Sequence, residues 1–305
     1  MKITEVMYFS LIGDGYICFW LEKGILMTKK KLILLTTTTL ILLAGLSVFS
    51  IWSSYNWLTV NTFELETAKL DDELRVVVIA DLHEHEFGGN NAKLIAEIKA
   101  QKPELILMVG DFVNNDSENV ELTCALIREL KNIAPVYYAL GNHELTYMEN
   151  TEIDLEEELE AAGTTVLEKE YEDVEINGKV VRIGGMYDYA FSIKNDDIQA
   201  FLSDFENTDN LKIMLSHRPD SFIFGDASTE WDIDLVVSGH LHGGQVVLPI
   251  FGGIYGGDQG CFPEYVHGLY KKDKMEIFVT SGLGSNPKKV PRFNNRPEIA
   301  VITLY

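Results

Sequence analysis

Five short apolar stretches of this chain stop abruptly, and each stop carries side chains that bind metal ions. The stretch from Asp232 to Gln245 has the sequence DIDLVVSGHLHGGQ, in which an apolar run ends shortly before His240 and His242. Such a run predicts a buried strand, and side chains two residues apart on an extended chain point to the same side. On its own this pair of histidines also fits a polar turn after a core strand. Its recurrence at four other strand ends favours one shared metal site.

The other four strand ends have the same form. The predicted strand 75–80 leads to DLH, 104–109 to GD, 136–140 to GNHE and 211–215 to SH. Loops at the carboxyl ends of strands in an α/β sheet gather at one crevice, so we expect these side chains to converge. The candidate residues are Asp81, His83, Asp111, Asn142, His143, His217, His240 and His242.

The chemistry of this set favours two divalent ions. It mixes carboxylates, imidazoles and an amide, which suits Mn, Fe or Zn better than Ca or an all-sulfur zinc site. The ligands are too many for one tetrahedral ion, and two ions that share a carboxylate use all of them. Two ions about 3.5–4 Å apart clamp the attacking and leaving oxygens in phosphoryl transfer, so this reaction class is the first expectation.

The remaining pattern predicts an α/β sandwich. Helical spacing of apolar residues occurs in the stretches 91–100, 119–132, 154–162 and 196–205. Residues 164–185 predict a hairpin with Asn177-Gly178 at its turn, and two more strands are expected at 276–280 and 298–303. Because strands and helices alternate early and strands dominate later, we expect paired sheets between helical layers.

The N-terminal part contains an apolar run of the length that crosses a membrane. Residues 32–52 carry no charge over 21 positions, and a spanning helix needs about 20. Lysines at 29–31 precede the run and Trp52, Tyr55 and Trp57 follow it, which predicts the N-terminus inside and the following domain outside. A single-pass membrane anchor is the main expectation, and a cleaved signal peptide or a soluble protein are the alternatives.

These features divide the chain into expected regions. Residues 1–31 form a cytoplasmic segment, 32–52 the transmembrane helix, 53–72 a polar linker and 73–305 the catalytic domain. The sequence MTKKK from Met27 has the form of a natural N-terminus, so we hypothesise that translation starts there and that residues 1–26 are not translated.

The charge of the domain argues against a nucleic-acid partner. The whole chain has a net charge of −22, and the part after residue 63 carries 20 Lys and Arg against 44 Asp and Glu. Such a surface repels a polyanion over most of its area. We therefore expect no nucleic acid among its substrates.

The motifs DLH, GD, GNHE, SH and GHLHGGQ, in this order, resemble those of the calcineurin-like metallophosphoesterases. The resemblance runs from about Val77 to the C-terminus. The complete HGGQ, the later SGLGS and Arg292 before RPEIAVITL are most similar to the bacterial membrane-associated phosphodiesterase branch. The resemblance implies a four-layer α/β/β/α sandwich and a dimetal-dependent phosphoester hydrolase, with phosphodiesters as the expected substrates.

The resemblance also implies a role for each candidate residue. The first metal would be bound by Asp81, His83 and His242. The second would be bound by Asn142, His217 and His240, with Asp111 bridging the two. A hydroxide between the metals would attack phosphorus, while His143 would protonate the leaving alkoxide and steady the phosphoryl oxygens.

Several assignments stay open at this stage. Glu144 either orients His143 or is a neighbour of a helix N-cap, and Arg292 either contacts substrate phosphate or is a surface charge. His85 is expected to be a solvent-exposed loop residue.

The loop 247–257 carries Phe251 and Tyr255, which either form an apolar wall for a lipid-linked phosphodiester or pyrophosphate or only pack under the site. A metal-binding ectodomain without catalysis is the alternative function, and His143 argues against it because a binding protein needs no leaving-group acid.

Overall fold

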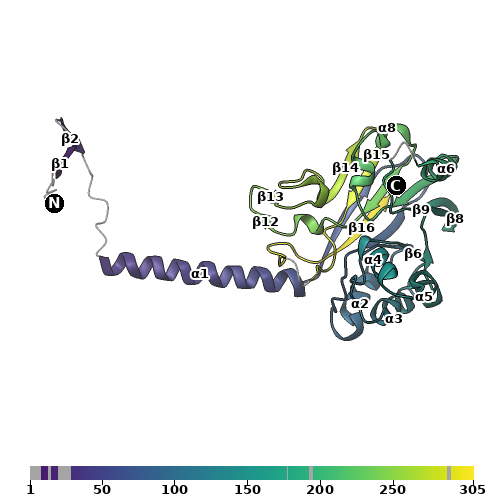
Figure 1. Cartoon of the computed structure of the whole chain (residues 1–305), viewed down its shortest axis with the longest axis horizontal. Coiled ribbons are helices and arrows are strands. Elements are labelled where there is room, and N and C mark those ends of the chain that lie inside the picture. The colour runs from purple at the N-terminus through teal and green to yellow at the C-terminus, as the bar shows by residue number, and fades with distance from the viewer. Residues whose placement is uncertain (1–7, 13–14, 20–28, 177, 192–194, 287–289) are drawn as a thin grey trace. The chain divides into compact units, whose positions relative to one another are not determined.

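The computed structural model describes residues 8–12, 15–19, 29–176, 178–191, 195–286 and 290–305. The chain divides into two compact units, Met1–Phe49 and Ser50–Tyr305. Unit 1 contains an antiparallel hairpin of β1 (Tyr8–Ile12) and β2 (Gly15–Phe19) and most of helix α1 (Lys29–Asn56), and unit 2 contains the remaining elements (Figure 1). The proposed start at Met27 lies outside the described residues.

Helix α1 covers the expected apolar run and continues past it. Its 28 residues are long and apolar enough to cross a membrane, a property shared by membrane anchors and signal sequences. The hydroxyl of Thr36 donates to the carbonyl of Leu32, and that of Ser54 to the carbonyl of Ser50, so polar side chains inside the run are satisfied within the helix. The last seven residues, Ser50–Asn56, belong to unit 2.

Unit 2 contains two six-stranded sheets, and the first follows the order β3-β16-β4-β5-β6-β7. Strands β4 to β7 are parallel, while β16 runs antiparallel to β4 and parallel to β3. The strands are β3 (Thr59–Leu65), β4 (Leu74–Ile79), β5 (Leu105–Val109), β6 (Val136–Ala139), β7 (Thr165–Val166) and β16 (Glu298–Leu304). The helices between them are α2 (Ala92–Ala100), α3 (Glu121–Leu130), α4 (Asn142–Asn150) and α5 (Leu155–Ala162).

The second sheet follows the order β14-β15-β11-β10-β9-β8. Its four central strands are parallel, and both edge strands are antiparallel to their neighbours. The strands are β8 (Glu170–Ile176), β9 (Lys179–Gly185), β10 (Leu211–Leu215), β11 (Leu235–Ser238), β14 (Gly268–Lys272) and β15 (Met275–Val279). Helices α6 (Asp196–Phe205), α7 (Asp220–Ile223) and α8 (Ala227–Glu230) belong to this half.

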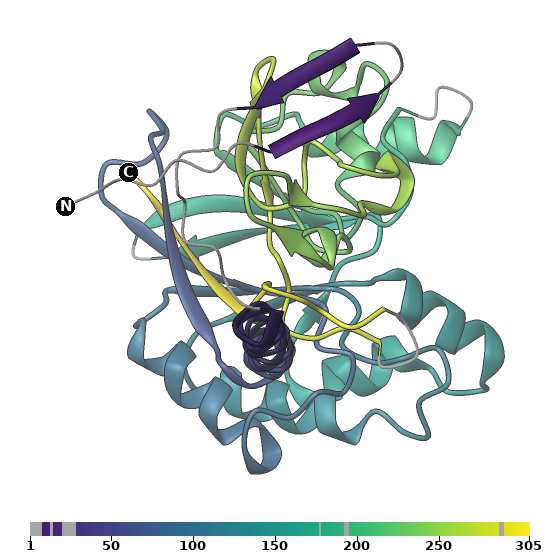
Figure 2. The same cartoon turned by 90° about the vertical axis from the view of Figure 1, so that its left-hand side faces the viewer.

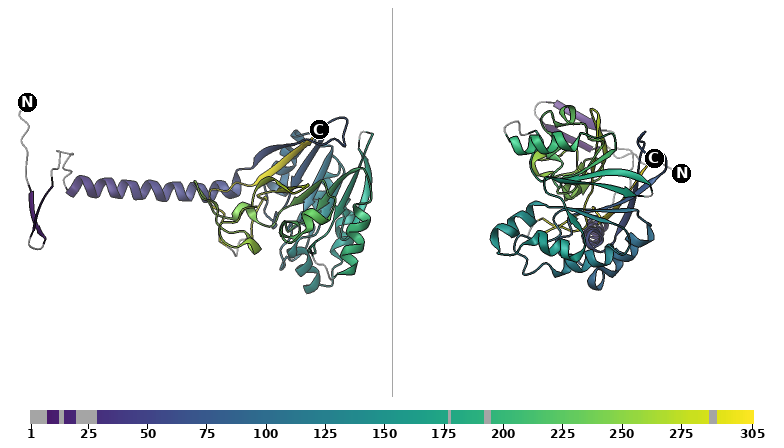
Figure 3. Two further views of the ribbon diagram at one scale, coloured as in Figure 1. Left: turned by 90° about the horizontal axis from the view of Figure 1, so that it is seen from above. Right: turned by 90° about the vertical axis from the view of Figure 1, so that its right-hand side faces the viewer.

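The buried side chains of unit 2 form three layers, as strand alternation requires. In β4, Val76 and Val78 join the cluster between the sheets, and Val77 and Ile79 join the cluster under helices α2, α3 and α5. A third cluster lies between the second sheet and helices α6 to α8. Figures 2 and 3 show the two sheets face to face with helices on both outer sides, so the predicted four-layer α/β/β/α sandwich is confirmed.

The structure corrects the expectation of a linker over residues 53–72. This segment contains β3, which pairs in parallel with β16 at the edge of the first sheet, and Ser53 and Ser54 are buried. The sequence TVNTFEL has three apolar residues among seven, so this edge strand lacks the continuous apolar run that marks the central strands.

The predicted hairpin is only partly correct. Strands β8 and β9 form it, with Ile176 opposite Lys179, and Asn177 lies outside the described residues. The residues before it do not take part in the hairpin, because β7 pairs with β6 in the other sheet. The chain therefore crosses from one sheet to the other after Val166.

Candidate metal centre

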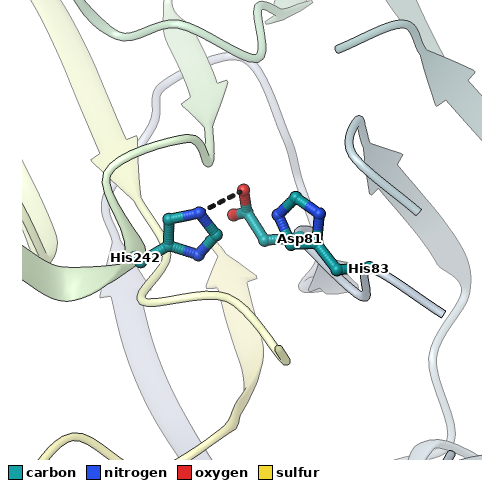
Figure 4. A group of neighbouring side chains, drawn as sticks. All are labelled: Asp81, His83 and His242. Atoms are coloured by element: carbon teal, nitrogen blue, oxygen red, sulfur yellow. Dashed lines mark ion pairs between the residues drawn. The ribbon is translucent and has the colours of Figure 1, made fainter. Parts of the chain in front are cut away.

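The five strand ends converge as expected. Asp81 and His83 follow β4, Asp111 follows β5, Asn142 and His143 begin α4 after β6, His217 follows β10, and His240 and His242 follow β11. Ligand atoms lie within 4.8 Å of one another in each of three groups. The groups are Asp81–His83–His242, His83–Asp111–His143 and Asp111–His217–His240. Figure 4 shows the first of them, whose residues follow β4 and β11, and the dashed line marks the contact between His242 and Asp81.

The backbone turns sharply at these residues to aim their side chains. Asp81, His83, Asp111, His240 and His242 all have positive φ, between 46° and 69°. L-residues adopt this region rarely and at a cost in free energy, and such residues cluster at functional sites where the surrounding fold holds them. This conformation bends the chain after β4, β5 and β11, where these residues lie.

Hydrogen bonds to Nδ1 orient three of the imidazoles. His217 Nδ1 lies 2.8 Å from the carbonyl oxygen of Val109, and His242 Nδ1 lies 3.2 Å from that of Gly284. His83 Nδ1 lies 3.1 Å from Oδ1 of Asn114. A carbonyl oxygen only accepts, so at His217 and His242 Nδ1 carries a proton, and Nε2 is the nitrogen that faces the site and can bind a cation when it carries no proton.

Some buried atoms of the site have no protein hydrogen-bond partner among the described residues. They are Nε2 of His83 and Oδ1 of Asn142, whereas Nε2 of His217 lies 3.2 Å from Oδ2 of Asp111. Nε2 of His83 lies 3.8 Å from Oδ2 of Asp111, and Nε2 of His242 lies 3.8 Å from Oδ1 of Asp81, both beyond hydrogen-bond range. Two ligands of one ion, each about 2.0–2.2 Å from it, have this kind of separation. The residues therefore fit divalent metal ions.

Glu144 holds the backbone around Asp111. It is fully buried, and its carboxylate accepts hydrogen bonds from the amides of Asp111, Phe112 and Gly141, each at 2.7–2.9 Å, and from the hydroxyl of Tyr138. It is also the third residue of α4, in a capping-box position. Of the two expectations for Glu144, the helix-cap neighbour is correct, and its contacts orient the Asp111 loop rather than His143.

His143 is fixed by the loop that follows Asp111. Its Nδ1 accepts the backbone N–H of Asn115 at 3.1 Å, so the neutral ring carries its proton on Nε2. Its backbone N–H donates to Oδ1 of Asp111 at 2.9 Å. The ring lies edge-on to that of His83, with centroids 4.8 Å apart, so His143 contributes an N–H beside the carboxylate and imidazole cluster.

Arg292 is neither a surface charge nor a phosphate contact in this structure. Its side chain is fully buried, and its guanidinium donates to the carbonyl oxygens of Ser281, Gly284, Asn295 and Arg296 and to Oδ1 of Asn295. These five hydrogen bonds engage every N–H of the guanidinium. Arg292 thus supports the loop whose Gly284 carbonyl orients His242, which corrects both expectations.

Two further histidines lie outside the cluster. His85 is partly buried rather than solvent-exposed, because Nε2 bonds to the carbonyl oxygen of Tyr55 at 2.7 Å and its ring packs on Phe87. His267 pairs with Glu298 at 2.7 Å. Neither belongs to any of the three ligand groups.

The loop after His242 does not pack under the site. It contains β12 (Val247–Leu248) and β13 (Gly252–Gly253), and the side chains of Phe251 and Tyr255 are 68% and 59% exposed. Gly257 lies beside His240, because a Cβ there would be 3.4 Å from Nε2 of that residue. The plainer expectation is wrong, and an exposed apolar loop borders the cluster.

The site holds protons where metal ions would bind. Burial raises the pKa of Asp81 to about 7, and burial lowers the pKa of His83 to about 4. At His217 burial lowers the pKa, but the carboxylates of Asp111 and Asp81 outweigh it and raise the pKa to about 9. His217 therefore keeps a proton at neutral pH until a cation replaces it.

The residues that support the ligands were missing from the prediction. Asn114 and Asn115 orient His83 and His143, and they follow the GD motif directly in the sequence VNND. Gly239 and Gly282 leave room for Asp81, since a Cβ at either would lie 2.7 Å from its Oδ2. In the sequence these residues are marked only by their closeness to the motifs, and this closeness does not indicate which side chain each of them supports.

Comparisons with known proteins agree with this geometry. The family model described as calcineurin-like phosphoesterase matches residues 74–244. An uncharacterized metallophosphoesterase of Campylobacter jejuni is 30% identical over 249 residues, which are 78% of this chain and 62% of that protein. The metallophosphoesterase YkuE of Bacillus subtilis is 30% identical, with 76% of this chain and 79% of that protein covered. The phosphodiesterase YaeI of Escherichia coli is 29% identical, with 75% and 82% covered. The chain thus spans less than two thirds of the Campylobacter protein.

Proposed function

The chain belongs to the calcineurin-like phosphoesterases, a family of metal-dependent phosphoester hydrolases, and on that premise we propose that it is a dimetal phosphodiesterase. The observation that carries the proposal is the convergence of eight polar residues from five strand ends, with buried ligand atoms that have no protein partner. The similarity to the E. coli phosphodiesterase favours diesters over monoesters.

The proposed ligands fall into two sets that share one carboxylate. Asp81, His83 and His242 would hold one ion. Asn142, His217 and His240 would hold the second, with Asp111 between the two. The ions, either Mn, Fe or Zn, would supply Lewis-acid stabilisation and an activated water for attack on phosphorus.

His143 would act on the substrate rather than on a metal. Asn115 donates to Nδ1, so the proton of the neutral ring is on Nε2, and this N–H would donate to the leaving oxygen or to a phosphoryl oxygen of a bound substrate. Donation to an oxygen that gains charge in the transition state lowers the barrier without adding a metal ligand.

A pair of variants tests these roles. His143→Ala should keep two metal ions per chain and lower kcat on bis-p-nitrophenyl phosphate by about 10²–10⁴, the usual range for a lost acid–base group. His217→Ala should lose bound metal and activity together. Metal analysis and kinetics on the same samples check both, and loss of metal from the His143 variant would refute its assigned role.

We further propose that α1 is a single-pass anchor that holds the catalytic domain outside the cytoplasm. The lysines at 29–31 precede the span, and Trp52 and Trp57 follow it, as in helices whose N-terminus stays inside. With Cys18 and Cys261 replaced by Ser, a cysteine placed at the exposed Val180 should react with a membrane-impermeant maleimide in intact cells. Reaction only after cell lysis would contradict this orientation.

The substrate class that we propose is a lipid-linked phosphodiester or pyrophosphate. The support is the exposed apolar loop beside His240, together with a domain charge that repels nucleic acid. Turnover of water-soluble diesters with none of lipid substrates in vesicles would count against it.

A further inference from the structure

Unit 2 exposes a group of large apolar side chains on the loops next to the cluster. Ile250, Phe251, Tyr255 and Phe262 are 59–101% exposed, and we call them the apolar rim. The backbone amide of Phe262 donates to the carbonyl of Ile254, so the two loops are held together. The 12 residues 246–257 carry no charge in a chain whose net charge is −22.

The apolar rim is tied to the end of α1. Within unit 2, the side-chain amide of Asn294 donates to the carbonyl of Val247 in β12, and its backbone N–H donates to the hydroxyl of Ser50 at 2.8 Å. The backbone N–H of Asn295 donates to the hydroxyl of Ser54 at 3.1 Å. Figure 1 shows β12 and β13 in a small lobe that stands apart from the two large sheets.

The same segment also reaches the metal ligands. The side-chain amide of Asn295 donates to the carbonyl oxygens of His242 and Gln245. Gly257, in the loop that carries Tyr255, lies against His240. One connected set of loops therefore contacts the last turns of α1, carries the apolar rim and borders the ligand cluster.

The connection of the apolar rim to the end of α1 indicates that a membrane would cover the rim. Trp52 is the last residue of the apolar run, so the turns formed by Ser50 and Ser54 lie at its end, where a spanning helix leaves the membrane. Trp57 is 48% exposed, and the guanidinium carbon of Arg296 lies 4.1 Å from the centroid of its ring. This amphipathic pair is suited to the membrane–water boundary. The loop that is hydrogen-bonded to these turns would therefore lie close to the membrane surface when the helix spans the membrane.

We propose that the apolar rim rests on the lipid bilayer and that the metal centre works at the depth of the lipid headgroups. The proposal depends on the anchor role proposed for α1. The proposal specifies the substrate as a phosphoester whose phosphorus lies at the membrane surface. The reason is that the metal ligands lie beside the apolar rim, so a rim in contact with lipid places them next to the headgroups. The rest of the acidic domain surface is repelled by anionic lipids, whereas the uncharged segment 246–257 is not. This segment is therefore the part of the domain that can approach such a membrane.

Spin labels on the full chain in proteoliposomes test the contact without any need for catalysis. In a background with Cys18, Cys124 and Cys261 replaced by Ser, a nitroxide is attached at Ile250→Cys or at Val180→Cys. Val180 is the matched control, 41% exposed near the start of β9, whereas the metal ligands follow the ends of the parallel strands. Collision with oxygen, which concentrates in lipid, is compared with collision with a water-soluble nickel complex.

The expected result is that the label at Ile250 meets oxygen more often than nickel, and that the label at Val180 shows the reverse. Equal access of nickel to both labels would overturn the proposal. An inactive enzyme would leave this result readable, so failure of the proposed activity and failure of the membrane contact are distinguishable.

A second measurement connects the contact to turnover. Phe251→Asp should lower the hydrolysis of a lipid-tailed p-nitrophenyl phosphodiester in vesicles by about tenfold or more, because an exposed apolar ring that contacts lipid is replaced by a charge. Turnover of soluble bis-p-nitrophenyl phosphate should not change, and Val180→Asp should alter neither. Equal losses on both substrates would contradict the proposal.

Discussion

At the scale of single residues, Glu144 connects the backbone of the two loops that follow β5 and β6. We expect Glu144→Gln to lower the free energy of unfolding by about 1–3 kcal/mol, because an amide NH₂ would face N–H donors of Asp111 or Gly141. Bound metal per chain should fall as well, since the loop that aims Asp111 loosens. Chemical denaturation and metal analysis measure the two effects. Glu160→Gln, on the exposed face of α5, is the control, and an equal effect of both variants would contradict this role.

Proton and metal binding should compete at the same residues. The folded pKa of His217, about 9, lies above its ordinary value, and that of Asp81, about 7, does too. Both groups favour the metal-free fold when protonated, and this contribution disappears as the pH rises through those values. Metal affinity should therefore rise from about pH 6 to about pH 9, by about tenfold per pH unit for each displaced proton.

Titration of chelator-treated protein with Mn²⁺ at several pH values measures this dependence. The metal-free protein should also unfold more easily at the upper end of the range than at the lower end. An affinity independent of pH would mean that His217 releases no proton when metal binds.

The sequence predicted which polar residues converge after the strand ends but not the residues that support them, for a physical reason. A ligand ends a buried strand, so Asp111 or His217 stands out as a polar side chain after an apolar run. Arg292 acts through backbone carbonyls that only the folded loop brings to it, and no spacing in the sequence reveals them. The expectations for Glu144 and Arg292 stayed open because of this difference.

At the scale of elements, β3 completes the first sheet and should be required for full stability. A chain that begins at Leu70 lacks β3 and leaves the edge of β16 unpaired. A chain that begins at Ser50 keeps the pairing of β3 with β16. We expect the shorter chain to lose about 2–4 kcal/mol of unfolding free energy, because Leu65 and Phe63 no longer cover apolar surface.

Denaturant titration of the two chains tests this expectation. Phe63→Ala in the longer chain should show a smaller loss, since Phe63 packs edge-on against Phe278 with ring centroids 4.7 Å apart. Equal stability of the two chains would show that β3 is dispensable.

Elements with strong apolar runs were predictable, and those without them were not. β5 is buried at every position, so its run of five apolar residues marks it clearly. α4 has few apolar residues and begins at Asn142 within the ligand motif, so it was absent from the predicted helices. β3 was mistaken for a linker because it has only three apolar residues among seven and no continuous apolar run.

At the scale of the whole molecule, a candidate membrane helix precedes a phosphoesterase domain in the chain. The last turns of α1 bond to the loop that contains Asn294 and Asn295, and this loop contacts the carbonyl of His242. The proposal of a substrate at the membrane surface is based on that chain of contacts. The four-layer sandwich supplies the convergence of strand ends on which the chemistry depends.

The central claim is that two divalent ions at the five strand ends hydrolyse a phosphodiester. The most direct measurement determines metal per chain and turnover of bis-p-nitrophenyl phosphate on the same sample of full chain with Mn²⁺, alongside Asp111→Ala. The account predicts two ions per chain and measurable turnover in the parent, with both lost in the variant. Turnover that survives in Asp111→Ala, or a parent that binds no metal, would contradict it.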